Sequence, residues 1–336
     1  MEQFSWTRRD FIKTATLAGG TALMAAATSM LGDEAAAYDK AQDRSGQGTD
    51  ITLHGVSDIH VHAAPDTKGR SINELSFARE AQKAGYRAVM YKSNEWSCHD
   101  RAYLVREALP GFECFGSLCM NRAHGDKVNV YAAEMALKTT GGFCRCIWMP
   151  TLAAAYQHKH DKLPGPGIAV LSDTGKVLPE VVRVMELCAE WNIIFATGHA
   201  SPDESIVMAR KAREVGVKKF VVTHANSHMW KMTREQILTV ADLDGWIEYS
   251  YITNLWGPGT GVPMHPRMSD AEFAGFAKIL PERSFITTDL GQLNMPHPLE
   301  GMKKCIFALR ESGMTQKDID LMVRSNPAML VGVAAS

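Results

Sequence analysis

The chain has no excess of charge of either sign. Its 336 residues include 36 Lys+Arg and 37 Asp+Glu, which gives a formal net charge of −1 at pH 7. A protein that binds nucleic acid or an anionic membrane over a large surface needs a clear excess of basic residues. The composition therefore argues against nucleic acid as a partner.

A disulfide framework and an internal linker are also missing. The seven cysteines are odd in number and lie mostly in apolar runs, so we expect buried thiols. Cys144 and Cys146 have the spacing of a soft-metal pair, but no second pair accompanies them. No Gly/Ser-rich stretch divides the chain, which predicts one domain over residues 51–336.

Long apolar runs are scarce, and the one at the N-terminus predicts an export signal. Arg8 and Arg9 precede a weakly hydrophobic stretch over residues 14–31, and small residues follow before Tyr38. This pattern is typical of a twin-arginine signal, here residues 1–37. An uncleaved anchor is the alternative, but a spanning helix needs about 20 strongly apolar residues.

Removal of residues 1–37 leaves 33 basic and 33 acidic residues. We expect the mature protein to be exported already folded by the twin-arginine machinery, to the periplasm or the extracellular space. No stable membrane anchor would remain after cleavage. Residues 38–50 are polar, and we expect them to be disordered.

Short β-rich runs alternate with helical segments along the rest of the chain. Helix-start signals occur at Ser71 with Glu74, and at Ser201 with Pro202. The expected strands cover residues 51–59, 87–92, 112–118, 143–149, 193–198, 219–223, 245–249 and 284–288. Eight strands separated by helices predict an α/β fold of the (β/α)8 TIM-barrel type. A doubly wound open sheet would also alternate, but its strand ends would not converge.

Residues with metal-binding or polar side chains end several of these strands. His60 and His62 lie two residues apart on the first strand and therefore share one face. The other residues of this kind are Lys92, His199, His224 and Asp289. Carboxyl ends of barrel strands meet at one mouth, where active sites of this architecture lie. The sequence thus predicts a metal site at that end.

The pattern resembles the amidohydrolase superfamily of metal-dependent hydrolases. That family has His-x-His on strand one, a histidine on strands five and six, and an aspartate on strand eight. These positions match His60, His62, His199, His224 and Asp289. Runs at 58–66, 197–199, 223–224, 288–292 and 326–328 resemble a branch catalogued as a domain of unknown function, and the likeness extends from residue 51 to the C-terminus.

Imidazoles with one carboxylate suit a divalent transition metal, and we expect Zn²⁺. In our hypothesis His60, His62, His199 and Asp289 hold one ion, and two ions are possible. Asp289 would accept the proton of the attacking water, and His224 would polarise the substrate carbonyl or stabilise the oxyanion.

Further residues at strand ends or in loops are expected to contact the substrate. Lys92 would contact an anionic group of the substrate, although a carboxylated lysine that bridges two metals is an alternative. The remaining candidates are Asn94, Arg122, Glu248 and Trp256. The long connections over residues 150–179 and 249–270 should cover the mouth, and the aromatic side chains of the second suggest a flat apolar ligand.

These observations predict a metal-dependent hydrolase that acts on a C–N, lactone or other ester bond of a small molecule. Two alternatives remain open. The same cation could serve a decarboxylase or hydratase of this superfamily. The protein could also be a non-catalytic exported metal or ligand-binding protein.

Overall fold

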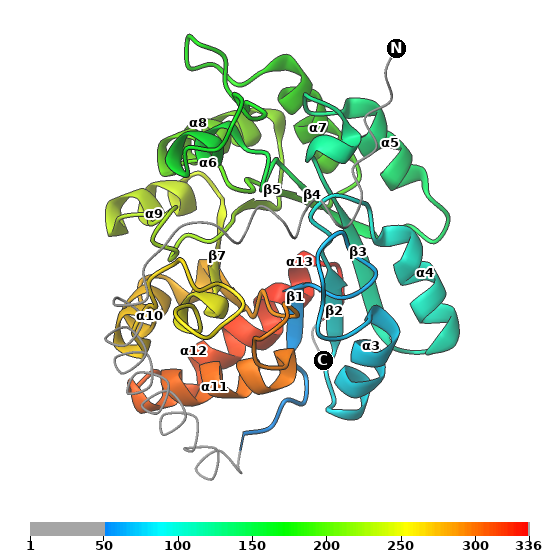
Figure 1. The fold of residues 1–336 in the computed structure, drawn as a ribbon, viewed down its shortest axis with the longest axis vertical. Helices are drawn as coiled ribbons and strands as arrows, with labels where there is room; N and C mark the ends of the chain where they lie inside the picture. The colour runs from blue at the N-terminus through cyan, green and yellow to red at the C-terminus, as the bar shows by residue number, and fades with distance from the viewer. Residues whose placement is uncertain (1–50, 335–336) are drawn as a thin grey trace, which may run out of the picture. The chain divides into compact units, whose positions relative to one another are not determined.

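The computed structural model describes residues 51–334, and eight parallel strands in this part form a nearly closed barrel (Figure 1). The strands are β1 (Ser57–Val61), β2 (Ala88–Tyr91), β3 (Glu113–Cys119), β4 (Cys144–Trp148), β5 (Ile194–Ala196), β6 (Phe220–Val222), β7 (Trp246–Ser250) and β8 (Ser284–Thr287). They pair in sequence order, and every ladder is parallel. The predicted (β/α)8 barrel is confirmed. The predicted signal (1–37) and polar segment (38–50) lie outside the described residues.

Helices follow the strands along the chain, and most of them lie on the outside of the barrel (Figure 1). They are α3 (Glu74–Lys83), α4 (His99–Ala108), α5 (Val130–Lys138), α6 (Ala155–His160), α7 (Pro179–Glu190), α8 (Pro202–Val215), α9 (Arg234–Asp242), α10 (Asp270–Ala277), α11 (Pro298–Glu311), α12 (Gln316–Asp320) and α13 (Asn326–Leu330). Short helical turns are η2 (Arg122–His124), η3 (Tyr251–Asn254), η4 (Pro281–Arg283) and η5 (Leu321–Ser325). Among the described residues, no helix is long and apolar enough to cross a membrane.

The barrel interior is filled with side chains, as the alternation of strand faces requires. Ile59, Phe115 and Trp148 belong to this inner cluster, and Leu330 of α13 packs into it. A larger cluster lies between the strands and the surrounding helices. All seven cysteines are buried and free, which confirms the expectation of buried thiols.

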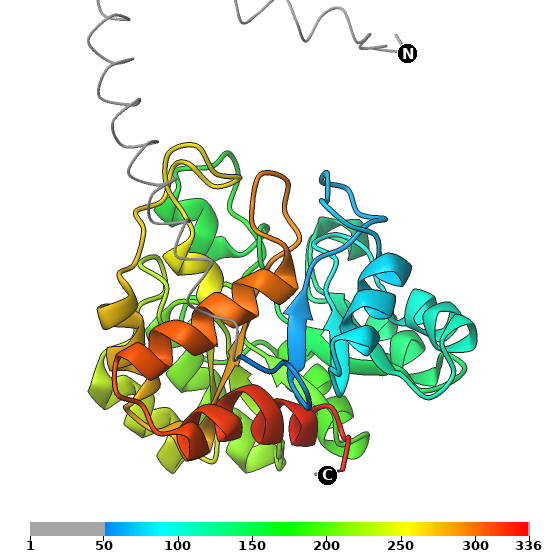
Figure 2. The same cartoon turned by 90° about the horizontal axis from the view of Figure 1, so that it is seen from below.

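The loops that follow β1, β7 and β8 lie together at one end of the barrel (Figure 2). The helix α13 lies at the opposite end. Because the strands are parallel, the first end collects their carboxyl termini. The fold therefore places the residues after each strand around one mouth.

Two local predictions need correction. The first strand begins at Ser57 rather than residue 51, because Val56 N donates to Leu53 O and closes a turn before the strand. The helix after β1 is capped by Asn73, whose side chain accepts from Ser76 N, and not by Ser71. Ser71 N is instead bonded to Gly291 O. The predicted cap at Ser201 is confirmed as a full capping box.

Candidate metal centre

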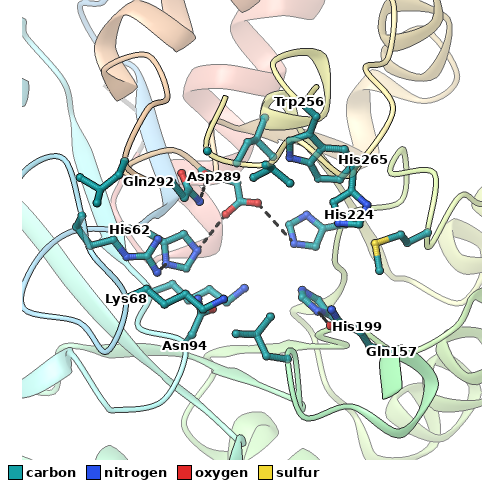
Figure 3. Close-up of a pocket in the computed structure, with 18 of the residues that line it drawn as sticks. His62, Lys68, Asn94, Gln157, His199, His224, Trp256, His265, Asp289 and Gln292 are labelled. Carbon is teal, nitrogen blue, oxygen red and sulfur yellow. Dashed lines mark hydrogen bonds and ion pairs between the residues drawn. The ribbon is translucent and has the colours of Figure 1, made fainter. Parts of the chain in front are cut away.

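Four segments bring histidines and a carboxylate to a cavity of about 400 Å³ at the mouth of the barrel (Figure 3). His62 and Asp289 lie close together, His224 faces Asp289, and His199 lies across the cavity from His62. His60 lies on β1, His62 follows directly after the end of that strand, and His60 is completely buried. The structure thus gathers the five residues that the sequence singled out as its main candidates.

Backbone hydrogen bonds between the ends of β1 and β8 set the centre of this site. Asp289 N donates to His60 O at 2.9 Å, and His62 N donates to Leu290 O at 2.8 Å. Gly291 permits this approach, because a Cβ atom there would overlap the carbonyl oxygen of His62. As a result, Asp289 Oδ1 lies 3.1 Å from His60 Nε2 and 3.0 Å from His62 Nε2.

Two of the candidate residues have left-handed backbone conformations. The φ angle is 56° at His224 and 52° at Asp289. A residue other than glycine holds such a φ only where the surrounding structure enforces it, and such residues cluster at functional sites. The Oδ2 atom of Asp289 lies 3.8 Å from His224 Nε2. Both residues therefore leave their strands in a way that aims the side chains at each other.

The carboxylate of Glu248 fixes the orientation of the His60 ring. Glu248 Oε1 lies 2.6 Å from His60 Nδ1 and also accepts from Thr287 Oγ1 at 2.8 Å. Glu248 is fully buried, and despite that burial its contacts with His60 keep the pKa of this carboxyl low. An ionised carboxylate can only accept, so His60 Nδ1 carries the proton and Nε2 remains for a cation.

His199 and His224 are oriented in the same way. His199 Nδ1 donates to Gln157 Oε1 at 2.5 Å, and the amide nitrogen of Gln157 donates to Asp161. His224 Nδ1 donates to Ser250 Oγ at 2.7 Å, because the Ser250 hydroxyl hydrogen points to Glu248 Oε1. Both histidines therefore present an Nε2 lone pair. This tautomer makes His224 Nε2 an acceptor in the metal-free site, and the role predicted for His224 towards the substrate stays a prediction.

His62 has a different partner on its Nδ1 atom. Arg70 Nη2 lies 3.0 Å from this nitrogen. The guanidinium is held by Asp66, which accepts from Nη2 at 2.6 Å and from Nε at 2.9 Å. Since arginine has only donors, His62 Nδ1 must accept, and its Nε2–H donates to Asp289.

Burial decides the charge state of most of these imidazoles. It lowers the pKa of His62 to about 3 and that of His224 to about 4, and it also lowers the pKa of His199. Burial and Lys92 also tend to lower the pKa of His60. The carboxylates of Asp289 and Glu248 outweigh both effects, so the pKa of His60 is raised. Burial opposes ionisation of Asp289, yet its histidine contacts keep the pKa of this carboxyl low.

The donor set fits a divalent transition metal. Ligand atoms that share one ion at about 2.1 Å lie roughly 3.0–3.4 Å apart, and the two separations around Asp289 Oδ1 are of this size. Among the described residues, two groups have ligand atoms that all lie within 4.8 Å of one another. One group is His60, His62 and Asp289, and the other is His60, His224 and Glu248. The centre thus offers nitrogen and oxygen ligands of the kind that zinc prefers.

The amine of Lys92 already contacts this centre. Its Nζ lies 3.0 Å from His60 Nε2 and 4.4 Å from the ring centroid of Trp148. The side chain is buried, and no carboxylate of the described residues pairs with it within 4.0 Å. The amine of Lys92 therefore contacts the nitrogen that a metal at His60 would use.

Only some of the residues predicted to contact the substrate line the cavity. Asn94, Lys92 and Trp256 line the cavity. Arg122 does not line it, because it lies on η2 and pairs with Asp126 at 2.7 Å. Glu248 lies beneath His60 and does not reach the cavity surface.

Several functional residues carried no recognisable signal in the sequence. Gln157 lies on α6 in a covering loop, and Ser250 ends β7. Trp230 packs its ring 4.2 Å from that of His199 and donates its Nε1 hydrogen to His199 O. Arg70 lies eight residues after His62. Only Ser250, as a polar residue at a strand end, followed the rule that found the histidines.

The model of the family of unknown function DUF6282 matches residues 55–248 of the chain. A comparison with curated proteins finds no match. Among solved structures, an amidohydrolase from Pseudomonas aeruginosa is 11% identical with a TM-score of 0.55, and the match covers 82% of this chain and 95% of that one.

Two further solved structures show the same architecture. A mutant organophosphorus hydrolase from Deinococcus radiodurans is 15% identical with a TM-score of 0.53, covering 83% of this chain and 92% of that one. A TatD homologue from Escherichia coli K12 is 13% identical with a TM-score of 0.52, covering 83% and 98%. At these identities the likeness supports the fold alone.

Proposed function

The chain belongs to the DUF6282 family, and from the geometry of its site we propose that it is a metal-dependent hydrolase of amidohydrolase type. The observation that carries the proposal is that His60 Nε2 and His62 Nε2 lie 3.1 Å and 3.0 Å from Asp289 Oδ1 at the edge of a cavity. The bond cleaved would be a C–N, lactone or other ester bond of a small molecule.

A bound divalent ion would lower the pKa of a water molecule enough to make it a nucleophile at neutral pH. His60, His199 and Asp289 present the lone pairs that can hold such an ion. Asp289 also accepts the proton that the attacking water loses. The lone pair of His224 Nε2 is 3.8 Å from Asp289 Oδ2, so His224 can take that proton and donate it to the leaving group.

The lining of the cavity supports a substrate with an anionic end and an apolar body. Lys68 and Asn94 line one side, whereas Trp256 lies on the other (Figure 3). Lys92 and Ile252 also line the cavity. Lys68 has no ion-pair partner within 4.0 Å among the residues that the structure describes. A carboxylate or phosphate group could therefore satisfy Lys68 while an apolar group packs against Trp256.

The test is a metal-dependent activity screen. Purified protein would be analysed for its metal content and then assayed against esters, lactones and amides that differ in charge. We expect hydrolysis that a chelator abolishes and zinc restores. A metal-loaded protein that hydrolyses none of them would contradict the proposal. Release of carbon dioxide without incorporation of solvent oxygen would instead identify a decarboxylase.

We also propose that the protein is exported through the twin-arginine pathway. The support is the sequence of residues 1–37, with Arg8 and Arg9 before a weakly hydrophobic stretch. This pathway carries folded proteins, which suits a barrel that acquires its metal before export.

A further inference from the structure

We propose that Arg70 is a positioning residue that fixes the tautomer of His62 and thereby weakens metal binding at that histidine. The inference rests on the proposed function, because it takes a divalent metal as the ligand of the site. It concerns one contact, the 3.0 Å approach of Arg70 Nη2 to His62 Nδ1.

The other three histidines of the site, His60, His199 and His224, differ from His62 in the partner of the Nδ1 atom. Their Nδ1 atoms face acceptors, namely Glu248 Oε1, Gln157 Oε1 and Ser250 Oγ. An acceptor at Nδ1 keeps the proton there, so that Nε2 has a lone pair for a metal. This arrangement is the usual one for histidines that bind metals.

Arg70 imposes the reverse arrangement on His62. A guanidinium has five N–H donors and no acceptor, so the lone pair of His62 must be on Nδ1. The proton is then on Nε2, where it donates to Asp289 Oδ1 at 3.0 Å. A metal bound at Nε2 would displace this proton to Nδ1. There it would point at an N–H group of Arg70.

Arg70 is not free to move away. Its side chain is 1% exposed, and Asp66 accepts two hydrogen bonds from it. Asp66 in turn accepts from Ser93 Oγ at 3.1 Å. The backbone of Arg70 forms a bridge with Gln292, next to the loop of Asp289. Metal binding at His62 therefore requires the loss of a well-supported hydrogen bond.

The geometry divides the ligands into two classes. His60, His199 and Asp289 are ready to bind a cation, whereas His62 acts first as a hydrogen-bond donor that orients Asp289. A metal that also takes His62 must separate it from Arg70. The hydrogen bond between Arg70 and His62 therefore limits the affinity of the site for a metal.

Removal of the Arg70 donors should tighten metal binding. We would use the double variant Arg70→Met with Asp66→Asn, because an unpaired Asp66 carboxylate could itself attract a metal. Asp66→Asn alone is the matched control, since it retains Arg70. Zinc affinity would be measured by competition with a chromophoric chelator. We expect about tenfold tighter binding in the double variant and little change in the control.

Gln157→Met is a second control, for which we expect weaker rather than tighter zinc binding. It removes the acceptor at His199 Nδ1, so zinc affinity should fall roughly 10- to 100-fold. If the double variant binds zinc no tighter than the unmodified protein, the proposal fails. Zinc binding with no hydrolysis in any variant would instead count against the proposed function, and the comparison of affinities would still decide the role of Arg70.

A spectroscopic measurement tests the tautomer directly. In metal-free protein labelled with ¹⁵N-histidine, the ring signals of His62 should be those of the Nε2–H form, and those of His199 should be those of the Nδ1–H form. The ring signals that disappear in His62→Asn would be assigned to His62. In the double variant His62 should change to the Nδ1–H form. An Nδ1–H form of His62 in the unmodified protein would overturn the inference.

Discussion

Replacement of Glu248 by glutamine should weaken metal binding without any direct contact between residue 248 and the substrate. Glu248 Oε1 accepts the Nδ1 hydrogen of His60 at 2.6 Å, and it is held in place by Thr287 Oγ1 at 2.8 Å and Ser250 Oγ at 3.3 Å. Because both hydroxyls donate to Oε1, the glutamine would keep its carbonyl oxygen at that position. The hydrogen bond to His60 would remain, but without the negative charge.

The size of the effect follows from the loss of that charge. A hydrogen bond to a charged group contributes about 1.5–3 kcal/mol, and a neutral one about 0.5–1.5 kcal/mol. The difference is roughly 1–1.5 kcal/mol, and about 1.4 kcal/mol corresponds to a factor of ten in affinity. We therefore expect zinc to bind about tenfold more weakly to Glu248→Gln.

The assay is competition for zinc with a chromophoric chelator, combined with KM at saturating metal. If Glu248 supports His60, the zinc affinity falls and KM at saturating zinc stays constant. If Glu248 contacts the substrate, as the sequence suggested, KM rises while the zinc affinity does not change. The second result would refute the structural assignment. A melting temperature close to that of the unmodified protein would exclude misfolding as the cause.

Four further predictions concern the site and the export of the chain. Asp289→Asn should lower turnover by a factor of about 10² to 10⁴ because it removes the proton acceptor, and full activity at saturating zinc would contradict this role. Burial lowers the pKa of His224 to about 4 from an ordinary value of 6.5, so the unfolded chain takes up a proton first as the pH falls. The contribution of His224 to stability, about 3 kcal/mol at pH 7, should therefore be lost between about pH 6.5 and 4 in metal-free protein, and urea unfolding that is independent of pH in this range would argue against the burial effect. Lys68→Met should raise KM for an anionic substrate about two- to fivefold but leave KM for its neutral analogue unchanged, and equal changes for both would remove Lys68 from the binding site. Arg8→Lys together with Arg9→Lys should retain the full-length precursor in the cytoplasm, and cell fractionation that finds the protein exported would speak against the twin-arginine signal.

The sequence predicted the barrel well because strand identity depends on local pattern. Each strand is a short apolar run followed by a polar or glycine-containing segment, and this pattern can be recognised from the local sequence alone. The exception is the start of β1. Ile51, Leu53 and Val56 are buried core residues, yet they lie before the strand. An apolar run that packs in the larger cluster between strands and helices has the same composition as one inside the sheet.

The helix start at Asn73 shows a second limit of local patterns. Ser71 and Glu74 have the spacing of a capping box, but Ser71 N is bonded to Gly291 O, more than 200 residues away in sequence. Ala64 and Asn73 also form a backbone bridge. These backbone contacts hold the segment before Asn73 in place, so the helix begins two residues later than its capping signal indicates.

The candidate metal-binding residues were visible in the sequence because they share chemistry and position, each being a histidine or aspartate at a strand end. The residues that orient them were not. Gln157 comes from a covering loop and Arg70 from the loop after β1, and neither residue type indicates contact with a histidine. Glu248 was recognised as a polar strand-end residue, but its place beneath His60 depends on the closure of the barrel.

The most direct test of the central claim is anomalous diffraction from crystals grown with zinc. We expect one strong peak about 2.1 Å from His60 Nε2 and within bonding distance of the Asp289 carboxylate. A peak at other residues, or no peak at the mouth of the barrel in zinc-loaded crystals, would contradict the account.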